Sequence, residues 1–500
     1  MIRSITLTLL ACLTFATPIL VLAGEALEPD LVIVHSNDLH ARYRPFDSRG
    51  ESRGGFARLA GQINALRDQY GERLIYLDAG DLFQGTPFYH FYRGELGMDL
   101  LDAMNCDAFA LGNHELDDGH ENFLRASKGV SFPKLCANVS LPDGPALLPA
   151  SARLERAGLT IDVVGIITAH LEEVTGVISR GELSMEDPAE ALQNWLDARN
   201  DSADLTVVLS HCGLGEDRGI AAKVTEPPLI ISGHSHSFID EPERVGETII
   251  CTTGAYGYYL GVLKLWREGE TWRMEHELIP INADTPEDPK IAALIEEVAV
   301  VVDREMAVKV GNLAADFPTR GKSGAANPLG QWIAELMRVE AGADMGMQNV
   351  GGYRTSLNGG EMSRGDVFTL LPFDNRIVRL TFRGEVLQEL FNTLAENFGS
   401  GRFCQSSGVS YRVENGKARD ILIGGAPLDP DAHYKVATLD FLLGGGDGYT
   451  VLQKAHIIEI LEAFPRDVME NWLRAGNVPS PSDFPPNVST TDETSSGDNY

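Results

Sequence analysis

Five short apolar runs in the first half of the sequence are each followed at once by aspartate, asparagine or histidine. They are LVIVHSNDLH at 31–40, LIYLDAGDLFQGTP at 74–87, ALGNHELDDG at 110–119, VVLSHCG at 207–213 and LIISGHSH at 229–236. These residue types bind metal ions and transfer protons. One such motif alone is more often a turn with satisfied hydrogen bonds, but five in one region favour a shared chemical site.

The elements that must position these residues follow from the spacing of the apolar runs. From about residue 30 to 280, such runs alternate with amphipathic stretches, which indicates buried strands joined by helices and hence an α/β layered domain. Ligands of such sheets bind beyond the carboxyl ends of the strands, so we expect the five strand ends to deliver side chains to one crevice. The candidates are Asp38, His40, Asp81, Asn113, His211, His234 and His236.

This set of side chains suits two divalent metal ions. Such a pair needs a ligand that bridges both ions and a mixed shell of carboxylates and imidazoles, with positions left for water and substrate. Two aspartates cancel only half of the four positive charges, so the surplus charge would hold a phosphate and ionise a water. Oxygen and nitrogen ligands fit Zn, Mn, Co or Fe and do not choose among them.

The remaining composition bounds the class of protein. A chain of 500 residues with 43% hydrophobic residues favours two globular domains with appendages. The formal net charge of −31 argues against binding to a nucleic acid polymer or to an anionic membrane surface. The segment 288–307 has helical apolar spacing and predicts a connecting helix, and the region from about 310 to 475 reads as a second domain.

The N-terminus predicts export. Arg3, an apolar run and small residues near Ala23 are typical of a cleaved secretory signal peptide, so we expect a periplasmic or secreted protein without a stable membrane anchor. Lipidation of Cys12 and a retained anchor are the rival interpretations. Removal of Cys12 leaves five cysteines, an odd number, so at least one should be unpaired within the chain. The polar, proline-rich C-terminus predicts a disordered tail.

These motifs, in this order, resemble the 5'-nucleotidase family, and GNHELDDG and SGHSH are its most specific marks here. The resemblance implies an N-terminal four-layer α/β/β/α calcineurin-like metallophosphatase domain, a connecting helix and an α+β 5'-nucleotidase C-terminal domain. The boundaries we expect are a signal peptide at 1–23, the metallophosphatase domain at 24–285, the helix at 286–310, the C-terminal substrate-binding domain at 311–475 and the tail at 476–500.

The resemblance also implies roles for the candidate residues. Asp38, His40 and His236 would hold one metal ion, and Asn113, His211 and His234 the other, with Asp81 bridging the two. The residue at the position of His236 varies between branches of the family. His114 and Asp117 would form a catalytic His-Asp dyad in which the aspartate favours a protonated imidazole that stabilises charge in the transition state. We expect Glu115 and Asp118 either to support the ligands from outside the ligand set or to be solvated, without a direct part in the chemistry.

In the second domain the resemblance nominates substrate-binding residues. QNVGGYR at 348–354 supplies Asn349 and Arg354, the latter as a fork that pairs with phosphate. GRFCQSSG at 401–408 and LDFLLGGGDGY at 439–449 supply Phe403 and Phe441 to clamp a base, and Asp447 to bind the ribose hydroxyls. The segment TRGKSGAANPLG at 319–330 departs from the family, because it lacks the usual glutamate and offers Arg320 or Lys322 for the usual arginine only if the alignment slips.

The resulting functional prediction is a dimetal phosphohydrolase that releases phosphate from nucleoside 5'-monophosphates by attack of a metal-bridging hydroxide. Hydrolysis of UDP-sugars or other nucleotide diphosphates is the nearest alternative, and a 2',3'-cyclic nucleotide phosphodiesterase with 3'-nucleotidase activity is another. The dimanganese thiohydrolase of thiosulfate oxidation shares the architecture, but it has no base for Phe403 and Phe441 to stack. A non-catalytic nucleotide-binding protein is disfavoured because all seven ligands and the dyad are present.

Overall fold

The computed structural model describes residues 28–48, 50–171, 181–199, 201–225, 229–269, 271–324 and 327–490. The expected signal peptide at 1–23 and residues 491–500 lie outside these ranges. Among the described residues, no helix combines the length and the apolar character that crossing a bilayer demands.

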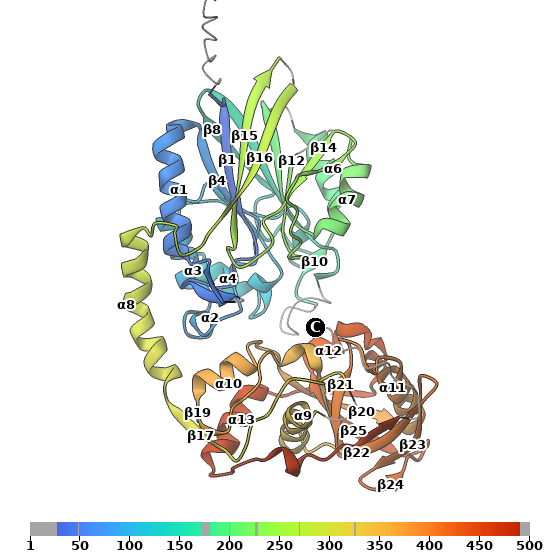
Figure 1. Ribbon diagram of the computed structural model, residues 1–500. Coiled ribbons are helices and arrows are strands. Elements are labelled where there is room, and N and C mark those ends of the chain that lie inside the picture. Colours follow the sequence, from blue (N-terminus) through green and yellow to red (C-terminus); the bar gives the residue numbers. More distant parts are fainter. Residues whose placement is uncertain are drawn as a thin grey trace, which may run out of the picture.

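Two sheets stacked face to face form the centre of the first domain (Figure 1). In the described residues the first sheet has the order β16 (Thr271–Pro280), β15 (Tyr259–Glu268), β1 (Leu31–Ser36), β4 (Leu74–Asp78), β5 (Ala108–Ala110) and β6 (Lys134–Leu135). The second has the order β13 (Glu243–Val245), β14 (Thr248–Cys251), β12 (Leu229–Ser232), β11 (Leu205–His211), β9 (Leu159–Ile167) and β8 (Ser151–Arg156). Their facing apolar side chains, such as Ile33, Leu77 and Val207, make a buried core between the sheets.

Helices cover the outer faces of both sheets. Those against the first sheet are α1 (Phe56–Tyr70), α2 (Pro87–Tyr92), α3 (Glu95–Ala103) and α4 (His120–Ala126). Those against the second are α6 (Pro188–Ala198) and α7 (Leu214–Lys223). Short strand pairs complete the domain: β2 (Phe46–Ser48) with β3 (Glu51–Arg53), and β7 (Val139–Ser140) with β10 (Ser184–Met185). The order of layers is helix, sheet, sheet, helix, which confirms the expected fold.

The strands that precede the five motifs end at one edge of this sandwich. β1, β4 and β5 are mutually parallel in the first sheet, as are β11 and β12 in the second. β1 has no exposed residue, which explains why its sequence is a continuous apolar run before the polar Ser36. The parallel pairing brings the polar residues after each strand to the side that faces the second domain (Figure 1).

The helix expected between the domains is α8 (Pro289–Met306). Its first turn is fixed by Pro289 and by Asp288, whose side chain accepts hydrogen bonds from the backbone N–H groups of Lys290 and Ile291. Ile291, Ile295, Ala299 and Val302 bury one face of the helix against the first domain. Figure 1 shows α8 running beside that domain to the start of the second.

The second domain has its own core. In the described residues, one sheet has the order β21 (Cys404–Ser407), β18 (Met345–Asn349), β25 (His433–Leu439), β20 (Ile377–Arg383) and β26 (Ile457–Ile460). A second sheet has the order β24 (Ala426–Pro427), β23 (Lys417–Ile423), β22 (Val409–Glu414) and β27 (Val488–Thr490). The strands β17 (Lys309–Leu313) and β19 (Gly360–Ser363) form a separate pair. The helices of this domain are α9 (Pro328–Glu340), α10 (Arg364–Leu370), α11 (Gly384–Glu396), α12 (Asp440–Leu443) and α13 (Pro465–Arg474). Trp332 and Phe391 lie in its buried centre.

The expectation of a disordered tail over 476–500 is wrong for the residues described there. β27 pairs in parallel with β22, and the ring of Phe484 stacks on Trp332 with the ring centroids 6.2 Å apart. Asn487 donates a hydrogen bond to the backbone oxygen of Ser406 and accepts one from Gln331. The segment is ordered because Phe484 and Val488 supply apolar anchors that its polar composition conceals.

Candidate functional site

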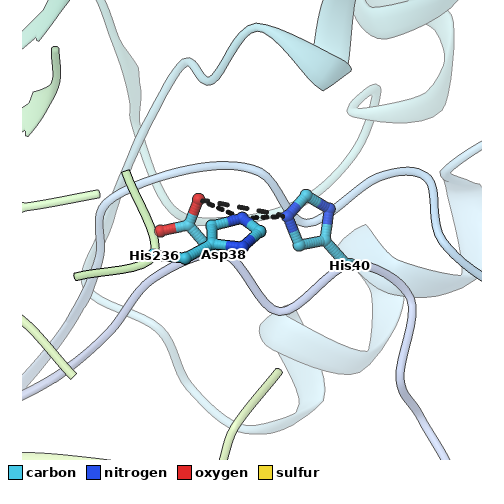
Figure 2. Close-up of side chains that lie close together, drawn as sticks. All are labelled: Asp38, His40 and His236. Carbon is cyan, nitrogen blue, oxygen red and sulfur yellow. Dashed lines mark hydrogen bonds and ion pairs between the residues drawn. The ribbon is translucent and has the colours of Figure 1, made fainter. Parts of the chain in front are cut away.

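The seven candidate metal ligands meet at the edge where the parallel strands end. His236 Nε2 lies 3.4 Å from Asp38 Oδ1 and 2.9 Å from His40 Nε2 (Figure 2). Beside this group, Asp81 Oδ2 lies 3.1 Å from His211 Nε2 and 3.9 Å from His40 Nε2. Asp81 therefore contacts both halves of the cluster.

Asn113 completes the second half. Its Oδ1 lies 2.8 Å from His234 Nδ1 and 3.2 Å from His211 Nε2. The donor atoms of Asp38, His40 and His236 all lie within 4.8 Å of one another, and so do those of Asp81, His211 and His234. His40, Asp81 and His114 form a third such group, which connects the other two through His40 and Asp81. The arrangement thus offers adjacent groups of oxygen and nitrogen donors with the Asp81 carboxylate between them.

The rings of the cluster differ in protonation: burial lowers the pKa of His211, but Asp81 outweighs it and raises that pKa to about 9, so this ring has to lose a proton before it can ligate. Burial lowers the pKa of both His40 and His234 to about 4, so these rings are neutral at pH 7, which is the form that ligates. Burial alone would raise the pKa of Asp81, but the neighbouring His211 and His114 hold it well below the usual value. The shared carboxylate is therefore ionised.

Hydrogen bonds from outside the cluster aim two of the rings. His211 Nδ1 lies 2.7 Å from the backbone oxygen of Ala79, and His40 Nδ1 lies 3.2 Å from that of Phe83. Donation to these carbonyls fixes the tautomer and leaves each Nε2 free toward the cluster.

The backbone around the ligands is held in an unusual conformation. Asp38, His40, Asp81, His234 and His236 all have φ between 48° and 70°. Left-handed conformations at non-glycine residues cost of the order of 1–3 kcal/mol each and concentrate at functional sites. The strand-exit turns therefore accept strain in order to point these side chains at one place.

Two of the motifs need a glycine directly before the candidate ligand, at Gly112 and at Gly233. A Cβ on Gly112 would lie 2.4 Å from the backbone nitrogen of Asp81, and one on Gly233 would lie 2.8 Å from His211 Nδ1. The backbone before Asn113 and before His234 can approach the cluster only without a side chain at these positions.

Glu115 supports the cluster from outside the ligand set, which is one of the two positions that the sequence left open for it. Its buried carboxylate accepts hydrogen bonds from the backbone N–H groups of Asp81, Leu82, Phe83 and Gly112. Burial and the nearby Asp81 raise its pKa to about 7. The side chain ties the turn after β4 to the turn after β5, and only the fold brings those turns together.

The candidate dyad is formed at the rim of the cluster. His114 Nδ1 lies 2.7 Å from Asp117 Oδ2, and the His114 backbone N–H donates to Asp81 Oδ1 at 2.9 Å. Burial lowers the pKa of His114, but Asp117 and Asp81 outweigh it and raise the pKa to about 10. His114 Nε2 lies 4.0 Å from Asp81 Oδ2, so the ring borders the cluster directly.

A cavity of about 380 Å³ joins the cluster to the second domain. It is lined by Asp81, Asn113 and His114 on one side and by Asn349, Phe441 and Asp447 on the other. Asn349 Nδ2 donates to Asp447 Oδ2 at 2.8 Å, so these two nominated residues act on each other at its wall. We call this space the Phe441 cavity.

Two nominated residues do not lie in the Phe441 cavity. Phe403 has no exposed surface and packs edge-on against Phe398, so its nomination as a base clamp is wrong in this arrangement. Its place in the sequence beside turn glycines gave no sign of this burial. Arg354 is exposed but lines a separate cavity of about 490 Å³, which His40 and His236 also border. We call this space the Arg354 cavity.

The segment between α10 and β20 supplies wall residues that the sequence analysis did not nominate. Phe373, Asn375 and Arg376 line the Phe441 cavity, and Phe373 is 38% exposed. Arg93 of the first domain holds this segment in place, because its Nη1 lies 2.9 Å from Asp118 Oδ2 and 3.1 Å from Asp374 Oδ2. The buried Arg466 also pairs with Asp374.

The sandwich fold, with its shared carboxylate and adjacent donor groups, defines a metal-dependent phosphoester hydrolase. Sequence comparison agrees: residues 31–238 match the model of the calcineurin-like phosphoesterases, and residues 307–454 match that of the 5'-nucleotidase C-terminal domain. The chain belongs to the 5'-nucleotidase family of two-domain metallophosphoesterases.

Relatives with the same architecture span nearly the whole chain. An apyrase of Tabanus yao is 28% identical, in an alignment that covers 85% of this chain and 87% of that protein. A 5'-nucleotidase of Vibrio vulnificus is 26% identical, in an alignment that covers 90% of this chain and 92% of that protein. The crystal structure of a 5'-nucleotidase precursor from Thermus thermophilus superposes with a TM-score of 0.74 at 26% identity, covering 93% of this chain and 99% of that one.

Proposed function

We propose that this protein is an exported phosphohydrolase that removes the phosphate from nucleoside 5'-monophosphates. One observation carries the proposal: a single cavity connects the metal-ligand cluster with Phe441 and Asp447. A phosphate at the cluster and a nucleoside against the second domain would therefore fit one continuous space. Relatives named 5'-nucleotidase support this substrate class.

The cluster would hold two divalent ions. Asp38, His40 and His236 would bind one, Asn113, His211 and His234 the other, and Asp81 both. Two such ions would supply Lewis-acid stabilisation of the phosphoryl group and activation of a water. The strained turns, the hydrogen-bonded rings and Glu115 position the donor atoms.

His114 and Asp117 would act on the phosphoryl group itself. The imidazolium, kept charged by Asp117, would donate from Nε2 to an oxygen that gains negative charge as the ester bond breaks. Because the ring borders both cavities, it lies beside any group bound over the cluster.

The second domain would select the nucleoside. We assign base stacking to Phe441, whose ring borders the cavity and is only partly buried, and ribose binding to Asp447 with Asn349. This wall favours a nucleotidase over a thiohydrolase, whose substrate carries no base. Arg354, which the sequence nominates for phosphate, lines the Arg354 cavity instead.

Export is supported by the N-terminal sequence, where residues 1–23 have the charge and apolar pattern of a signal peptide. Cleavage there would give a mature chain that begins near Gly24, with its catalytic unit at 24–285 and its substrate-binding unit at 311–475. Mass spectrometry of secreted protein tests this: an intact Met1 start or a lipid on Cys12 would exclude it.

A substrate panel tests the activity. Metal-free protein reloaded separately with Zn, Mn, Co or Fe is offered AMP, UMP, ADP, UDP-glucose, a 2',3'-cyclic nucleotide and glycerol phosphate. The proposal expects the highest kcat/KM for a nucleoside 5'-monophosphate. A preference for UDP-glucose or the cyclic nucleotide would replace the proposed substrate, and equal rates with glycerol phosphate would show a general phosphatase.

A further inference from the structure

Arg93 is a first-domain arginine that contacts both domains beside the Phe441 cavity. It directly follows α2 and has a left-handed φ of 47°. Its Nη1 lies 2.9 Å from Asp118 Oδ2 in the first domain and 3.1 Å from Asp374 Oδ2 in the second. Both carboxylates line the Phe441 cavity. One guanidinium group therefore connects the two walls of this cavity.

The first domain fixes the position of Arg93. Its backbone N–H donates to the carbonyl oxygen of Tyr89 at 2.7 Å. The hydroxyl of Tyr89 donates to Asp118 Oδ2 at 2.8 Å, the same oxygen that accepts from Arg93. Asp118 directly follows Asp117 of the dyad. Arg93 is thus held against residues 114–118, which we call the dyad turn.

The second domain holds Asp374 from the opposite side. The buried Arg466 pairs with Asp374 and donates from Nη1 to the carbonyl oxygen of Phe373 at 3.2 Å. Its Nη2 lies 3.3 Å from Nδ1 of His90. Burial is the main cause that lowers the pKa of His90 to about 4, and repulsion by Arg466 and Arg93 adds to it, so the ring is neutral at pH 7 and can accept. Asp374 therefore lies between an arginine of each domain.

The charges of this bridge act across the domain boundary. Without a cation between them, Asp118 and Asp374 would repel each other. Arg93 replaces that repulsion by attraction, because it pairs with both. The side chains of Asp118 and Asp374 are 20% and 6% exposed, so solvent screens the bridge less than an exposed ion pair. The bridge therefore opposes separation of the dyad turn from residues 373–376, which we call the wall segment.

We propose that Arg93 is a positioning residue for the nucleoside part of the substrate, because it sets the spacing between the dyad turn and the wall segment. A nucleotide would span both, with its phosphate at the metal-ligand cluster and its nucleoside against the second domain. A phosphate ester without a base would contact the cluster alone, so its hydrolysis would depend little on that spacing. This inference rests on the proposed function.

The test measures kcat and KM of the metal-loaded full chain for AMP and for glycerol phosphate. Arg93→Gln removes the charge of the bridge, so kcat/KM for AMP should fall about five- to thirtyfold, mainly through KM. With glycerol phosphate the change should stay within about twofold, because this substrate does not reach the wall segment. Arg93→Lys keeps the charge without the planar fork and should recover part of the preference for AMP.

Arg44→Gln is the matched control. The side chains of Arg44 and Arg93 are both 32% exposed, and Arg44 also pairs with two carboxylates, those of Glu296 and Asp303 in α8. Arg44 is not among the described residues that line either cavity. The ratio of kcat/KM for AMP to that for glycerol phosphate should therefore stay at the wild-type value. Thermal unfolding and metal content verify that each variant is folded and loaded.

Amide hydrogen exchange gives a second readout that needs no activity. Mass spectrometry follows the peptide that contains the wall segment in the metal-loaded protein without substrate. Arg93→Gln should speed exchange there, because the segment loses its contact with the first domain, whereas Arg44→Gln should leave the exchange rate unchanged.

The positioning role is overturned if Arg93→Gln leaves the ratio of AMP to glycerol phosphate hydrolysis at the wild-type value, or if Arg44→Gln lowers it equally. In that case hydrolysis of nucleotides by the wild-type protein still supports the proposed function. If the wild-type protein hydrolyses no nucleotide, the proposed function is wrong and the exchange rates decide about the bridge. Faster exchange in Arg93→Gln alone then supports the bridge, and unchanged exchange excludes it.

Discussion

The Phe441 cavity and the Arg354 cavity share His114, His236, Gln84 and Phe373, yet their charges are opposed. The described lining of the Phe441 cavity has one arginine, Arg376, and six aspartates, namely Asp81, Asp117, Asp118, Asp374, Asp440 and Asp447. The described lining of the Arg354 cavity has two arginines and no carboxylate. Beyond the cluster itself, the first wall offers acceptors for sugar and base N–H and O–H groups, and the second offers donors for anions.

The contrast between the two linings indicates how an acidic protein can orient a phosphate ester. If the proposed function holds, the carboxylates of the Phe441 cavity would disfavour phosphoryl groups in the space proposed for a nucleoside, and the arginines of the Arg354 cavity would attract them. The walls of the two cavities would then orient the substrate over the cluster. Variants of the cluster residues should slow the hydrolysis of every substrate, whereas variants in the wall of one cavity should slow some substrates more than others.

The largest effect is expected for Asp81→Asn. Asp81 is the carboxylate that both donor groups share, so its loss should weaken binding of both ions and lower kcat/KM for all phosphate esters on the order of a thousandfold or more. Elemental analysis and kinetics with AMP and glycerol phosphate measure this. An active variant that retains two ions per chain would show that Asp81 does not bridge them.

His114→Ala should lower turnover without loss of metal. The imidazole borders both cavities and is charged by Asp117, so its removal should cost about 10²–10⁴ in kcat with either substrate type. Metal content should stay near that of the wild-type protein. If the ions are lost together with activity, His114 belongs to the ligand set instead.

Glu115→Gln should weaken metal binding about 10- to 100-fold. The carboxylate accepts hydrogen bonds from four backbone N–H groups around the cluster. The side-chain NH₂ of glutamine cannot accept, so some of these four hydrogen bonds would be lost. Competition with a chelator measures the affinity. Asp118→Asn is the matched control, since Asp118 binds Tyr89 and Arg93 away from the ligands. An equal loss of metal affinity in the two variants would show that Glu115 does not support the metal site.

Phe441→Ala should lower the hydrolysis of nucleotides but not that of phosphate esters without a base. Stacking is worth about 1–3 kcal/mol per base, so kcat/KM for a nucleotide should fall roughly ten- to a hundredfold, while glycerol phosphate hydrolysis changes little. Phe403→Ala provides the contrast. Its buried ring should cost about 3–5 kcal/mol of unfolding free energy, and both substrates should be affected alike. A nucleotide-selective loss in Phe403→Ala would reinstate it as a base contact.

The meeting of the seven candidate ligands at one place could be predicted from the sequence because each lies within a few residues of a strand end, and parallel pairing makes such ends meet. Glu115 and Arg93 could not be assigned their contacts in this way, since the first acts through backbone groups of another turn and the second through a residue of the other domain. Phe403 was misjudged because its burial depends on Phe398, which no local pattern indicates. The ordered segment around Phe484 was missed for the same reason.

The central claim is that two metal ions at the Asp81 cluster hold the phosphate while the Phe441 wall holds the nucleoside. Anomalous diffraction from crystals of the metal-loaded protein, soaked with a non-hydrolysable nucleoside 5'-phosphonate, tests it most directly. The account predicts two anomalous peaks that both contact Asp81, the phosphonate over them, and the base against Phe441. A single peak, or a base bound in the Arg354 cavity, would contradict it.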